Sequence, residues 1–319
     1  MQECHHLLIL GAGWTATFLI PLLRARSLSF AATTRDGRTV AEHPTQAWTF
    51  DPDDTSPAQF HSLPLARNIL ITFPIVTSGA STRLVHGYNA VWKHRLDADG
   101  ARFVQLGSTG IWSIPANASR TWIDRHSPHS ETSARAQAED ELLATTPAVG
   151  DDGGGDGGGD TPRNNAAVLN LAGLWGGTRQ PRDWRARVAK TKDDVRGKTS
   201  LHMVHGVDVG RAVLAILARW EAARGQRWML TDGFVYDWWA LFAGWADVEE
   251  GRSSSAAAGA RDDDSDATPA QTAQWVSELM RPEEGDVRAL PRSMEALGRC
   301  YDSREFWATF GLVPLKARI

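Results

Sequence analysis

The feature that most constrains the fold of this chain is a glycine turn that follows its first apolar run. Residues 7–10, Leu-Leu-Ile-Leu, are apolar without interruption, and Gly11, Gly13 and Ala16 follow in the spacing G-x-G-x-x-A. A short uninterrupted apolar run is typical of a strand that is buried on both faces of a sheet. Residues 7–16 are therefore predicted to run from a buried strand through a tight turn into a helix.

This turn has the composition that a dinucleotide-binding site requires. Gly11 permits the sharp bend, Gly13 lets the backbone approach a pyrophosphate, and Ala16 allows the helix to pack closely on the strand. Trp14 and Thr15 stand at the start of the helix, where unpaired N–H groups attract anions. We predict that these five residues bind the pyrophosphate of a nicotinamide cofactor, the alternative being a purely structural turn.

Short apolar runs alternate with segments of helical periodicity along much of the chain. This alternation predicts an α/β fold with a doubly wound parallel sheet, the Rossmann fold, and a small C-terminal lobe on the substrate side. The predicted strands are residues 7–10, 29–33, 47–51, 68–72, 103–106, 168–171 and 227–230. The predicted helices are residues 81–96, 131–145, 209–223, 271–280 and 303–310.

Two segments lack the apolar residues that a packed core needs. Residues 150–165 contain the run GDDGGGDGGGD, and residues 249–270 contain SSSAAAGARDDDSD. Both are predicted to be disordered surface insertions. We accordingly divide the chain into a dinucleotide-binding domain, residues 1–232, and a small lobe, residues 233–319.

The composition narrows the range of partners. The formal net charge is -4 at pH 7, so nucleic acid and anionic membranes are poor candidates for the main partner. No apolar run approaches the ~20 residues that cross a bilayer. Cys4 and Cys300 have the spacing of neither a disulfide framework nor a metal site. We expect a cytoplasmic protein with no bound metal that acts on a small molecule.

The residues after the second predicted strand bear on the choice between NAD and NADP. About 20 residues beyond the glycines, an acid hydrogen-bonds the ribose 2′-hydroxyl of NAD, whereas arginine accommodates the 2′-phosphate of NADP. This chain has Arg35 followed by Asp36. Because arginine pairs with phosphate in a bidentate manner, NADP is the preferred cofactor and NAD the alternative. An ordinary solvated arginine is the other interpretation of Arg35.

Three further residues are predicted to contact the adenine and ribose of the cofactor. Asp51 ends the third predicted strand, and Phe73 and Pro74 follow the fourth. Ligands of doubly wound sheets bind outside the carboxyl ends of the strands. Phe73 and Pro74 also suit a core position and a turn position, so both interpretations stay open.

Four later segments resemble the motifs of one family. The string LGSTGIW, residues 106–112, resembles the Ser-Ser-x-x-Val-Tyr-Gly motif of the extended short-chain dehydrogenases/reductases, the NAD-dependent epimerase/dehydratase family. Residues 138–143 resemble that family's Ala-Glu-x-x-Leu run, and residues 169–176 its Leu-Arg-x-x-x-x-Tyr-Gly strand and turn. Residues 205–209 resemble its His-Val-x-Asp-Val/Leu segment. The matches keep the family's order along the chain.

The resemblance also assigns structural residues. Trp112 and Trp175 stand where the family usually has tyrosine, and we expect both to be large structural side chains beside the cleft. Asp208 is expected to be the N-cap of the helix that follows it.

The resemblance implies hydride transfer with a tyrosine as acid/base, a lysine that lowers its pKa, and a serine or threonine that holds the substrate oxygen. Ser108 matches the hydroxyl position, with a strand-end cap as the alternative. Glu131 stands where the tyrosine is expected and Arg135 where the lysine is expected, so Tyr-x-x-x-Lys is absent. Glu131 is either a base or a first-turn acid that the helix dipole favours. His126 and His129 are alternative proton carriers.

Two functions follow from this mixture of matches and departures. The first is an NAD(P)-dependent oxidoreductase or epimerase with altered proton-transfer groups, whose small-molecule substrate the sequence does not name. The second is a non-catalytic sensor or regulatory protein that binds the nicotinamide nucleotide without turnover.

Overall fold

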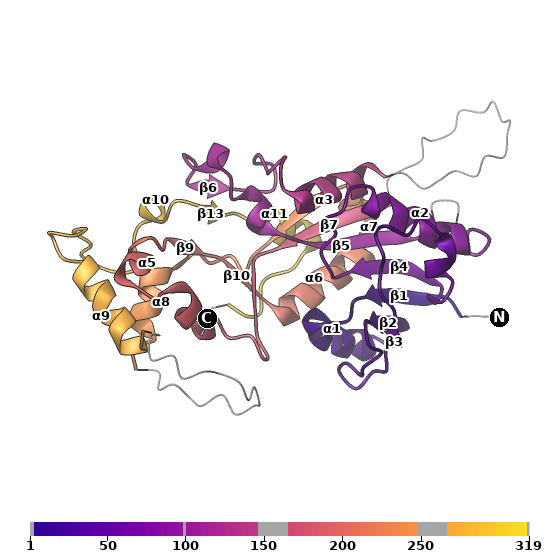
Figure 1. Cartoon of the computed structure of the whole chain (residues 1–319), viewed down its shortest axis with the longest axis horizontal. Helices are drawn as coiled ribbons and strands as arrows, with labels where there is room; N and C mark the ends of the chain where they lie inside the picture. The colour runs from indigo at the N-terminus through magenta and orange to yellow at the C-terminus, as the bar shows by residue number, and fades with distance from the viewer. Residues whose placement is uncertain (1–2, 98–99, 146–164, 248–266, 318) are drawn as a thin grey trace.

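The apolar runs of the sequence form a seven-stranded parallel sheet. The structure is a computed structural model that describes residues 3–97, 100–145, 165–247, 267–317 and 319. The order of strands in the sheet is β11-β7-β5-β4-β1-β2-β3, on the right of Figure 1. Its strands are β1 (His5–Leu10), β2 (Phe30–Thr34), β3 (Gln46–Ala47), β4 (Ala66–Ile71), β5 (Arg102–Ser108), β7 (Ala166–Leu171) and β11 (Arg227–Leu230).

The chain order reverses between β1 and β4, which are adjacent in the sheet. All neighbouring strands of this sheet pair in parallel, so their carboxyl ends share one edge. In doubly wound sheets ligands bind in the crevice at this kind of reversal. The glycine turn lies there, directly after β1.

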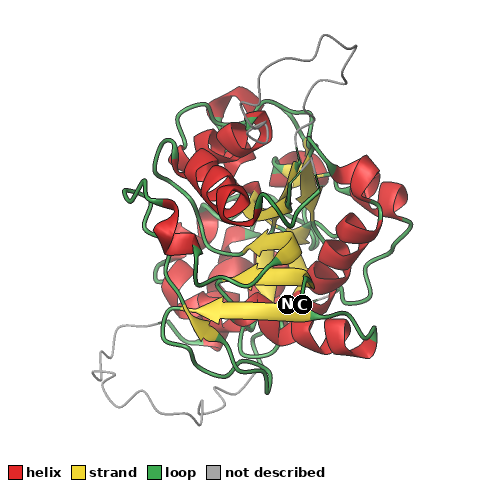
Figure 2. Cartoon of the chain, turned by 90° about the vertical axis from the view of Figure 1, so that its right-hand side faces the viewer, coloured by secondary structure: helices red, strands yellow, loops and turns green. Residues whose placement is uncertain are grey.

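Helices cover both faces of the sheet, as Figure 2 shows. Successive residues of β1 point to opposite faces: Leu7 and Ile9 pack in one buried cluster, and Leu8 and Leu10 in another. The first face carries α1 (Trp14–Ala25), α6 (Gly206–Ala218), α7 (Trp220–Ala223) and α11 (Arg304–Phe310). The second face carries α2 (Ala80–Trp92) and α3 (Ala134–Ala144). The predicted doubly wound α/β fold is confirmed.

Several predicted boundaries were wrong, and three of them differ most. β3 is Gln46–Ala47, so of the strand predicted at 47–51 only Ala47 is in a strand. The helix predicted at 131–145 begins at Ala134, because the Ser133 side chain caps it. The helix predicted at 209–223 is two helices, α6 and α7, which are separated at Arg219.

The predicted N-cap of α6 was also wrong. The cap is His205, whose Nδ1 accepts a hydrogen bond from Val207 N at 3.1 Å. Asp208 lies inside the first turn and is fully buried. Its carboxylate accepts hydrogen bonds from the backbone N–H groups of Leu315 and Lys316. Asp208 therefore ties the C-terminal segment to α6.

A separate apolar cluster lies away from the sheet, on the left of Figure 1. It brings together Ala189 and Val195 with Phe242, Val276 and Leu279. The cluster thus takes residues from both sides of position 232, and the division of the chain at 232 stays a prediction. Its elements are α4 (Arg185–Val188), α5 (Lys192–Arg196), β9 (Ser200–Leu201), β12 (Tyr236–Asp237), α8 (Trp238–Gly244) and α9 (Pro269–Leu279).

The two predicted insertions fall mainly outside the described residues. Positions 150–164 and 249–266 are not described. The described chain resumes with buried Asn165 and Ala267, and Thr268 caps α9. The last residues of the predicted 249–270 insertion are therefore ordered, which the sequence analysis did not anticipate.

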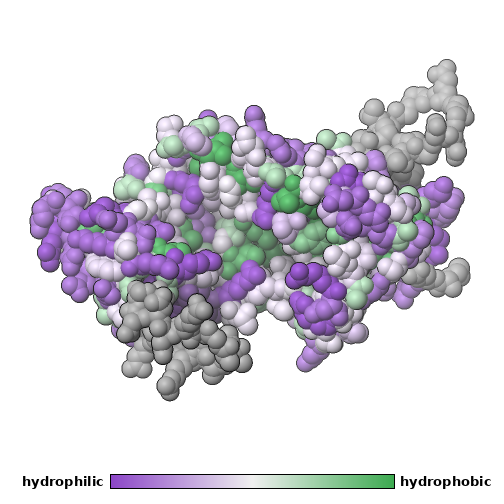
Figure 3. Space-filling view, viewed as in Figure 1, coloured by the Kyte–Doolittle hydropathy of each residue, from purple (hydrophilic) through white to green (hydrophobic). Residues whose placement is uncertain are grey.

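Short helices and strands connect the longer elements of the fold. No helix of the described ranges is long and apolar enough to cross a membrane. Figure 3 shows apolar side chains gathered in the middle of one face, between the sheet and the lobe that carries α9. The short elements are η1 (Pro57–Phe60), η2 (Thr109–Trp112), η3 (Pro115–Asn117), β6 (Trp122–Ile123), β8 (Gly173–Trp175), η4 (Pro181–Trp184), β10 (Met203–His205), α10 (Met294–Leu297) and β13 (Cys300–Tyr301).

Candidate cofactor site and sheet edge

The glycine turn is held closely against the neighbouring strands. Gly11 has φ +86°, and a Cβ atom there would come 2.9 Å from Thr72 Oγ1 and 3.0 Å from Phe73 Cδ1. Gly11 N donates to Thr33 Oγ1 at 3.2 Å, and Ala12 N donates to Thr33 O at 2.6 Å. Only glycine combines this dihedral angle with this space, so the turn depends on Gly11.

The N-terminus of α1 is left without a protein cap. No side chain in the described part of the chain accepts a hydrogen bond from its first N–H groups, and the first turn contains no acidic residue. A Cβ at Gly13 would meet only Gly11 O, at 3.8 Å, so the space in front of the helix is open. Unpaired N–H groups and the positive end of the helix dipole favour an anion at this point.

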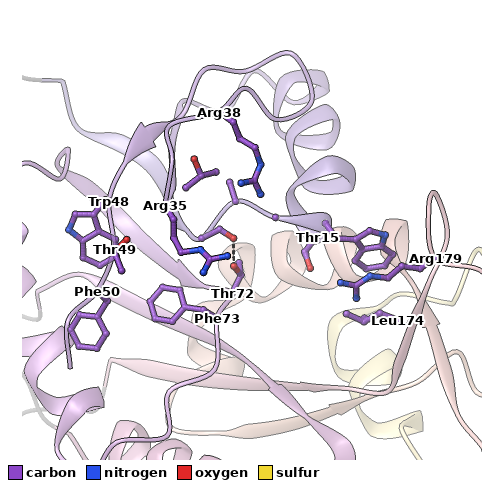
Figure 4. A pocket seen from close by; sticks show the side chains of 15 residues that line it. Thr15, Arg35, Arg38, Trp48, Thr49, Phe50, Thr72, Phe73, Leu174 and Arg179 are labelled. Atoms are coloured by element: carbon purple, nitrogen blue, oxygen red, sulfur yellow. Dashed lines mark hydrogen bonds between the residues drawn. The ribbon is translucent and has the colours of Figure 1, made fainter. Parts of the chain in front are cut away.

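A cavity of about 510 Å³ opens in front of the turn, shown in Figure 4. Its volume lies in the range of ordinary ligand sites. Most of the predicted cofactor residues line it: Gly11, Gly13, Trp14, Thr15, Arg35 and Phe73. The other lining residues are Ala12, Thr34, Arg38, Trp48, Thr49, Phe50, Thr72, Leu174 and Arg179.

Three predicted cofactor residues do not line the cavity. Ala16 is a fully buried residue of α1 that packs in the apolar cluster on the sheet. Asp51 is exposed, and its carboxylate accepts a hydrogen bond from Asp53 N at 2.9 Å. Pro74 is exposed beside Phe73. The structure therefore brings the residues before Asp51 and Pro74 to the cavity.

Aromatic rings form one wall of the cavity. Phe50 lies between Trp48 and Phe73, with ring centroids 6.3 Å and 6.2 Å away and near-parallel planes. The Trp48 indole donates to Gln59 O at 2.8 Å, which fixes its plane. Flat apolar surfaces of this kind stack on a base. Trp48 and Phe50 were not predicted, because the chain turns into the cavity where a strand was expected.

The charged residues that line the cavity are all arginines. Arg38 pairs with the Asp36 carboxylate at 2.9 Å. Arg35 and Arg179 make no ion pair with a carboxylate of the described chain. No aspartate or glutamate belongs to the lining described above. The cavity is therefore electropositive and suits a polyanionic ligand.

Ser108 lies at the carboxyl end of β5 and caps η2. Its Oγ accepts a hydrogen bond from Gly110 N at 3.2 Å. The capping alternative is thus observed, and the substrate-binding role stays a prediction. Trp112, on the same short helix, is fully buried and donates to Ser127 O at 3.1 Å. Trp175 is half-buried against His205, with ring centroids 4.6 Å apart.

Glu131 and Arg135 occupy different environments. Glu131 is exposed and precedes the capping residue Ser133, so its interpretation as a first-turn acid was wrong. Arg135 is half-buried on α3 and shares a small void with Glu139. Burial raises the pKa of Glu139, while hydrogen bonds from Asn170 Nδ2 and Arg227 Nε oppose that rise. Neither Glu131 nor Arg135 is among the described residues that line the cofactor cavity.

The histidines upstream of α3 are engaged with acids. His126 Nε2 lies 2.9 Å from Glu305 Oε2, and His129 Nε2 lies 3.3 Å from Asp140. His129 also lies 3.2 Å from Arg227 Nη1. A role for either histidine as a proton carrier stays a prediction.

The tyrosine hydroxyls of the chain have partners of their own. Tyr88 donates to Pro64 O at 2.9 Å, and Tyr301 donates to Thr109 O at 3.0 Å. Tyr301 is therefore next to η2, but its hydroxyl bonds the backbone beyond Ser108. None of these contacts reproduces the missing Tyr-x-x-x-Lys pair.

The third tyrosine forms a pair with a buried acid at the same edge of the sheet. Tyr236 donates to Asp232 Oδ2 at 2.6 Å. Burial raises the pKa of Asp232 to about 6, against the opposing hydrogen bond from Tyr236. Asp232 follows β11, whose Leu230 is in register with Leu171 of β7, which in turn is in register with Ser108. No local motif had indicated this pair.

Known proteins resemble this chain in fold but not detectably in sequence. No family model matches the chain, and no significant match exists among curated protein sequences. Solved structures, in contrast, match it over nearly its whole length. The chain is similar to a proposed NAD-dependent epimerase/dehydratase from Methylobacillus flagellatus at 14% identity and a TM-score of 0.52, covering 96% of this chain and 92% of that one.

Two further structures agree. A yeast methylglyoxal/isovaleraldehyde reductase complexed with NADPH matches at 14% identity and a TM-score of 0.54, over 97% of this chain and 93% of that one. A short-chain dehydrogenase/reductase superfamily protein from Agrobacterium tumefaciens with bound NAD matches at 10% identity and a TM-score of 0.56, over 98% and 93%. The chain has a Rossmann fold. It is the fold of the extended short-chain dehydrogenases/reductases.

Proposed function

We propose that this chain binds NADP(H) in the cavity in front of the glycine turn. The observation that carries the proposal is the uncapped N-terminus of α1, which faces a cavity whose charged lining residues are all arginines. Of the structures similar in fold, the yeast reductase is complexed with NADPH and the Agrobacterium protein has bound NAD. Bound NADP(H) would supply hydride transfer.

The choice of NADP over NAD rests on two arginines. Asp36 is the acid nearest the end of β2, and Arg38 already neutralises it. Arg35 lines the cavity without a carboxylate partner among the described residues. A free guanidinium favours a 2′-phosphate, whereas a ribose 2′-hydroxyl needs a free acceptor.

Calorimetric titration with NAD⁺, NADH, NADP⁺ and NADPH tests this proposal. Arg35→Ala should weaken NADP⁺ at least about tenfold and leave NAD⁺ unchanged, because one charge-assisted contact is lost. Arg26→Ala, at the exposed far end of α1, is the matched control and should change neither affinity. An unchanged preference for NADP⁺ in Arg35→Ala would remove the role given to Arg35.

For the reaction, we propose a reductase or epimerase that acts on a small carbonyl or hydroxyl compound. Ser108 is retained as the group that binds the substrate oxygen, and Asp232 with Tyr236 as the proton-exchanging pair. What supports the pair is its short hydrogen bond and its place two strands from Ser108 on one sheet edge. An acid with a pKa near 6 exchanges protons readily near neutral pH. Glu131 is given no proton-transfer role, and a cytoplasmic location stays part of the proposal.

A sensor without turnover is the second candidate function. It is favoured by the exposed position of Glu131 and by the engaged hydroxyls of Tyr88 and Tyr301. NADPH oxidation against a panel of aldehydes and ketones distinguishes the two. Turnover that falls in Tyr236→Phe and Ser108→Ala supports the enzyme, and NADPH binding without turnover supports the sensor.

A further inference from the structure

A tight turn after β8 reaches back to the cofactor cavity. Gly176 N donates to Arg179 O at 2.8 Å, and Arg179 N donates to Gly176 O at 3.1 Å. Gly177 between them has φ +56°. Two reciprocal hydrogen bonds across two residues define the path of residues 176–179, so the position of Arg179 is set by the turn.

The turn is fastened to the first residue of α1. The Trp14 indole Nε1 donates to Gly176 O at 3.1 Å, although the two residues are 162 positions apart. The Arg179 guanidinium carbon lies 4.6 Å from the centroid of the Trp14 ring. A guanidinium over an indole face is stabilised by the ring's quadrupole and keeps its N–H donors free for another ligand. Trp14 therefore holds Arg179 beside the helix N-terminus.

Among the described residues, Arg179 has no acidic partner of its own. It is exposed, lines the cavity, and pairs with no carboxylate of the residues described. Figure 4 shows it beside Leu174, on the opposite side of Thr72 from Arg35 and Arg38. The two ends of the cavity thus carry separate positive charges.

We propose that Arg179 is a phosphate-binding residue that holds the pyrophosphate of the dinucleotide beside the N-terminus of α1, with Trp14 as its positioning residue. The inference rests on the proposed function, because it assumes that a dinucleotide occupies the cavity. The helix N-terminus supplies backbone donors, and Arg179, held next to it by Trp14, supplies planar side-chain donors. Arg35 and Arg179 then bind two different phosphates of one ligand.

This arrangement links the cofactor to the small lobe. The chain passes from Arg179 directly into η4 and α4, and α4 precedes residues of the separate apolar cluster. The segment that holds the pyrophosphate is therefore the segment that leaves the sheet for the lobe.

Binding of NADP⁺ and NAD⁺ to the full chain tests the inference, because both nucleotides contain the pyrophosphate. Arg179→Met should weaken both by the same factor, about tenfold for one exposed charge-assisted contact. Arg35→Ala should weaken the binding of NADP⁺ and leave that of NAD⁺ unchanged. Arg182→Met is the matched control, since Arg182 is exposed three residues away and outside the described lining, and it should change neither affinity. Trp14→Phe keeps an aromatic face but loses the indole donor, so it should give a smaller loss for both.

Three other binding results would each overturn one of these hypotheses. If Arg179→Met leaves both affinities unchanged while wild type binds, the inference is overturned and the proposed function stands. A loss confined to NADP⁺ would move Arg179 to the 2′-phosphate and overturn the pyrophosphate assignment. If wild type binds neither nucleotide, the proposed function itself fails. Melting temperatures of all variants show whether a loss of affinity reflects a loss of fold.

Discussion

Two regions of one sheet edge, after β1 and after β5, differ in how closely they match the motifs of the short-chain dehydrogenases/reductases that the sequence resembles. At β1 the glycine turn, the helix without a side-chain cap and the arginines surround one cavity, which we propose binds the cofactor. At β5 Ser108 is present, but Glu131 and Arg135 stand where the resemblance expects tyrosine and lysine. The site proposed after β1 relies largely on backbone geometry and charge, whereas proton transfer needs particular side chains. Cofactor binding at β1, as proposed, therefore does not require the tyrosine and lysine that the resemblance expects.

The largest expected effect is on nucleotide affinity, from a substitution in the glycine turn. Gly13→Asp places a carboxylate in the open space before α1, where it repels the pyrophosphate. We expect the affinity for NADP⁺ to fall at least about a hundredfold, because apposed like charges cost several kcal/mol. Gly244→Asp, at a glycine with open space on α8, is the control for an added charge. Calorimetry measures both, and equal affinities in the two variants would show that the glycine turn is not the binding site.

Low pH should destabilise the fold through the buried side chain of His202. His202 Nε2 accepts a hydrogen bond from Tyr301 N at 3.0 Å. Burial, with repulsion from Arg299, lowers the pKa of His202 to about 3. The stability that depends on neutral His202 is complete above the unfolded pKa of about 6.5 and is lost as the pH falls towards 3.

By pH 5 this loss should amount to about 2 kcal/mol of unfolding free energy. His202→Gln cannot become charged, so its unfolding free energy should change less than that of wild type between pH 7 and pH 5. Urea denaturation at the two pH values measures the difference. Parallel losses in both proteins would show that His202 is not the group responsible.

Removing the Ser108 hydroxyl should lower the stability of the fold without changing NADP⁺ affinity. Ser108→Ala deletes the acceptor for Gly110 N, and loss of a helix cap costs about 1 kcal/mol. NADP⁺ affinity should stay within about twofold of wild type, because Ser108 is not among the described lining residues of the cavity. Thermal melting and calorimetry on the same sample check both parts. A large loss of affinity would extend the cofactor site to β5.

The smallest effect is expected at Glu131. Its side chain is exposed and precedes α3, so Glu131→Gln should change the unfolding free energy by less than about 0.5 kcal/mol. NADP⁺ affinity and any NADPH oxidation should also be unchanged. A clear fall in turnover would give Glu131 the catalytic role that its position does not support.

Local signals predicted most of the sheet and most of the residues that meet at the cavity after β1. The apolar run before Gly11 and the spacing to Arg35 are encoded within short stretches, and both line up with the observed β1 and β2. Arg179 could not be predicted in this way. Its position depends on the contact between Trp14 and Gly176, which only the folded chain brings together.

The Asp232–Tyr236 pair was missed for a similar reason. Its residues are close in sequence, but its relation to Ser108 depends on the register of β11, β7 and β5. The end of the third strand was misplaced because residues 48–50 are apolar or β-favouring yet turn towards the cavity. Local propensity does not distinguish a strand end from an aromatic wall.

The central claim is that the chain binds NADP(H) at the glycine turn. The most direct measurement is calorimetric titration of the full wild-type chain with NADP⁺ and with NADPH. We expect saturable one-to-one binding of both nucleotides, with a dissociation constant between about 1 μM and 1 mM, the range usual for enzyme ligands. No saturable binding of either nucleotide at millimolar concentration would contradict it.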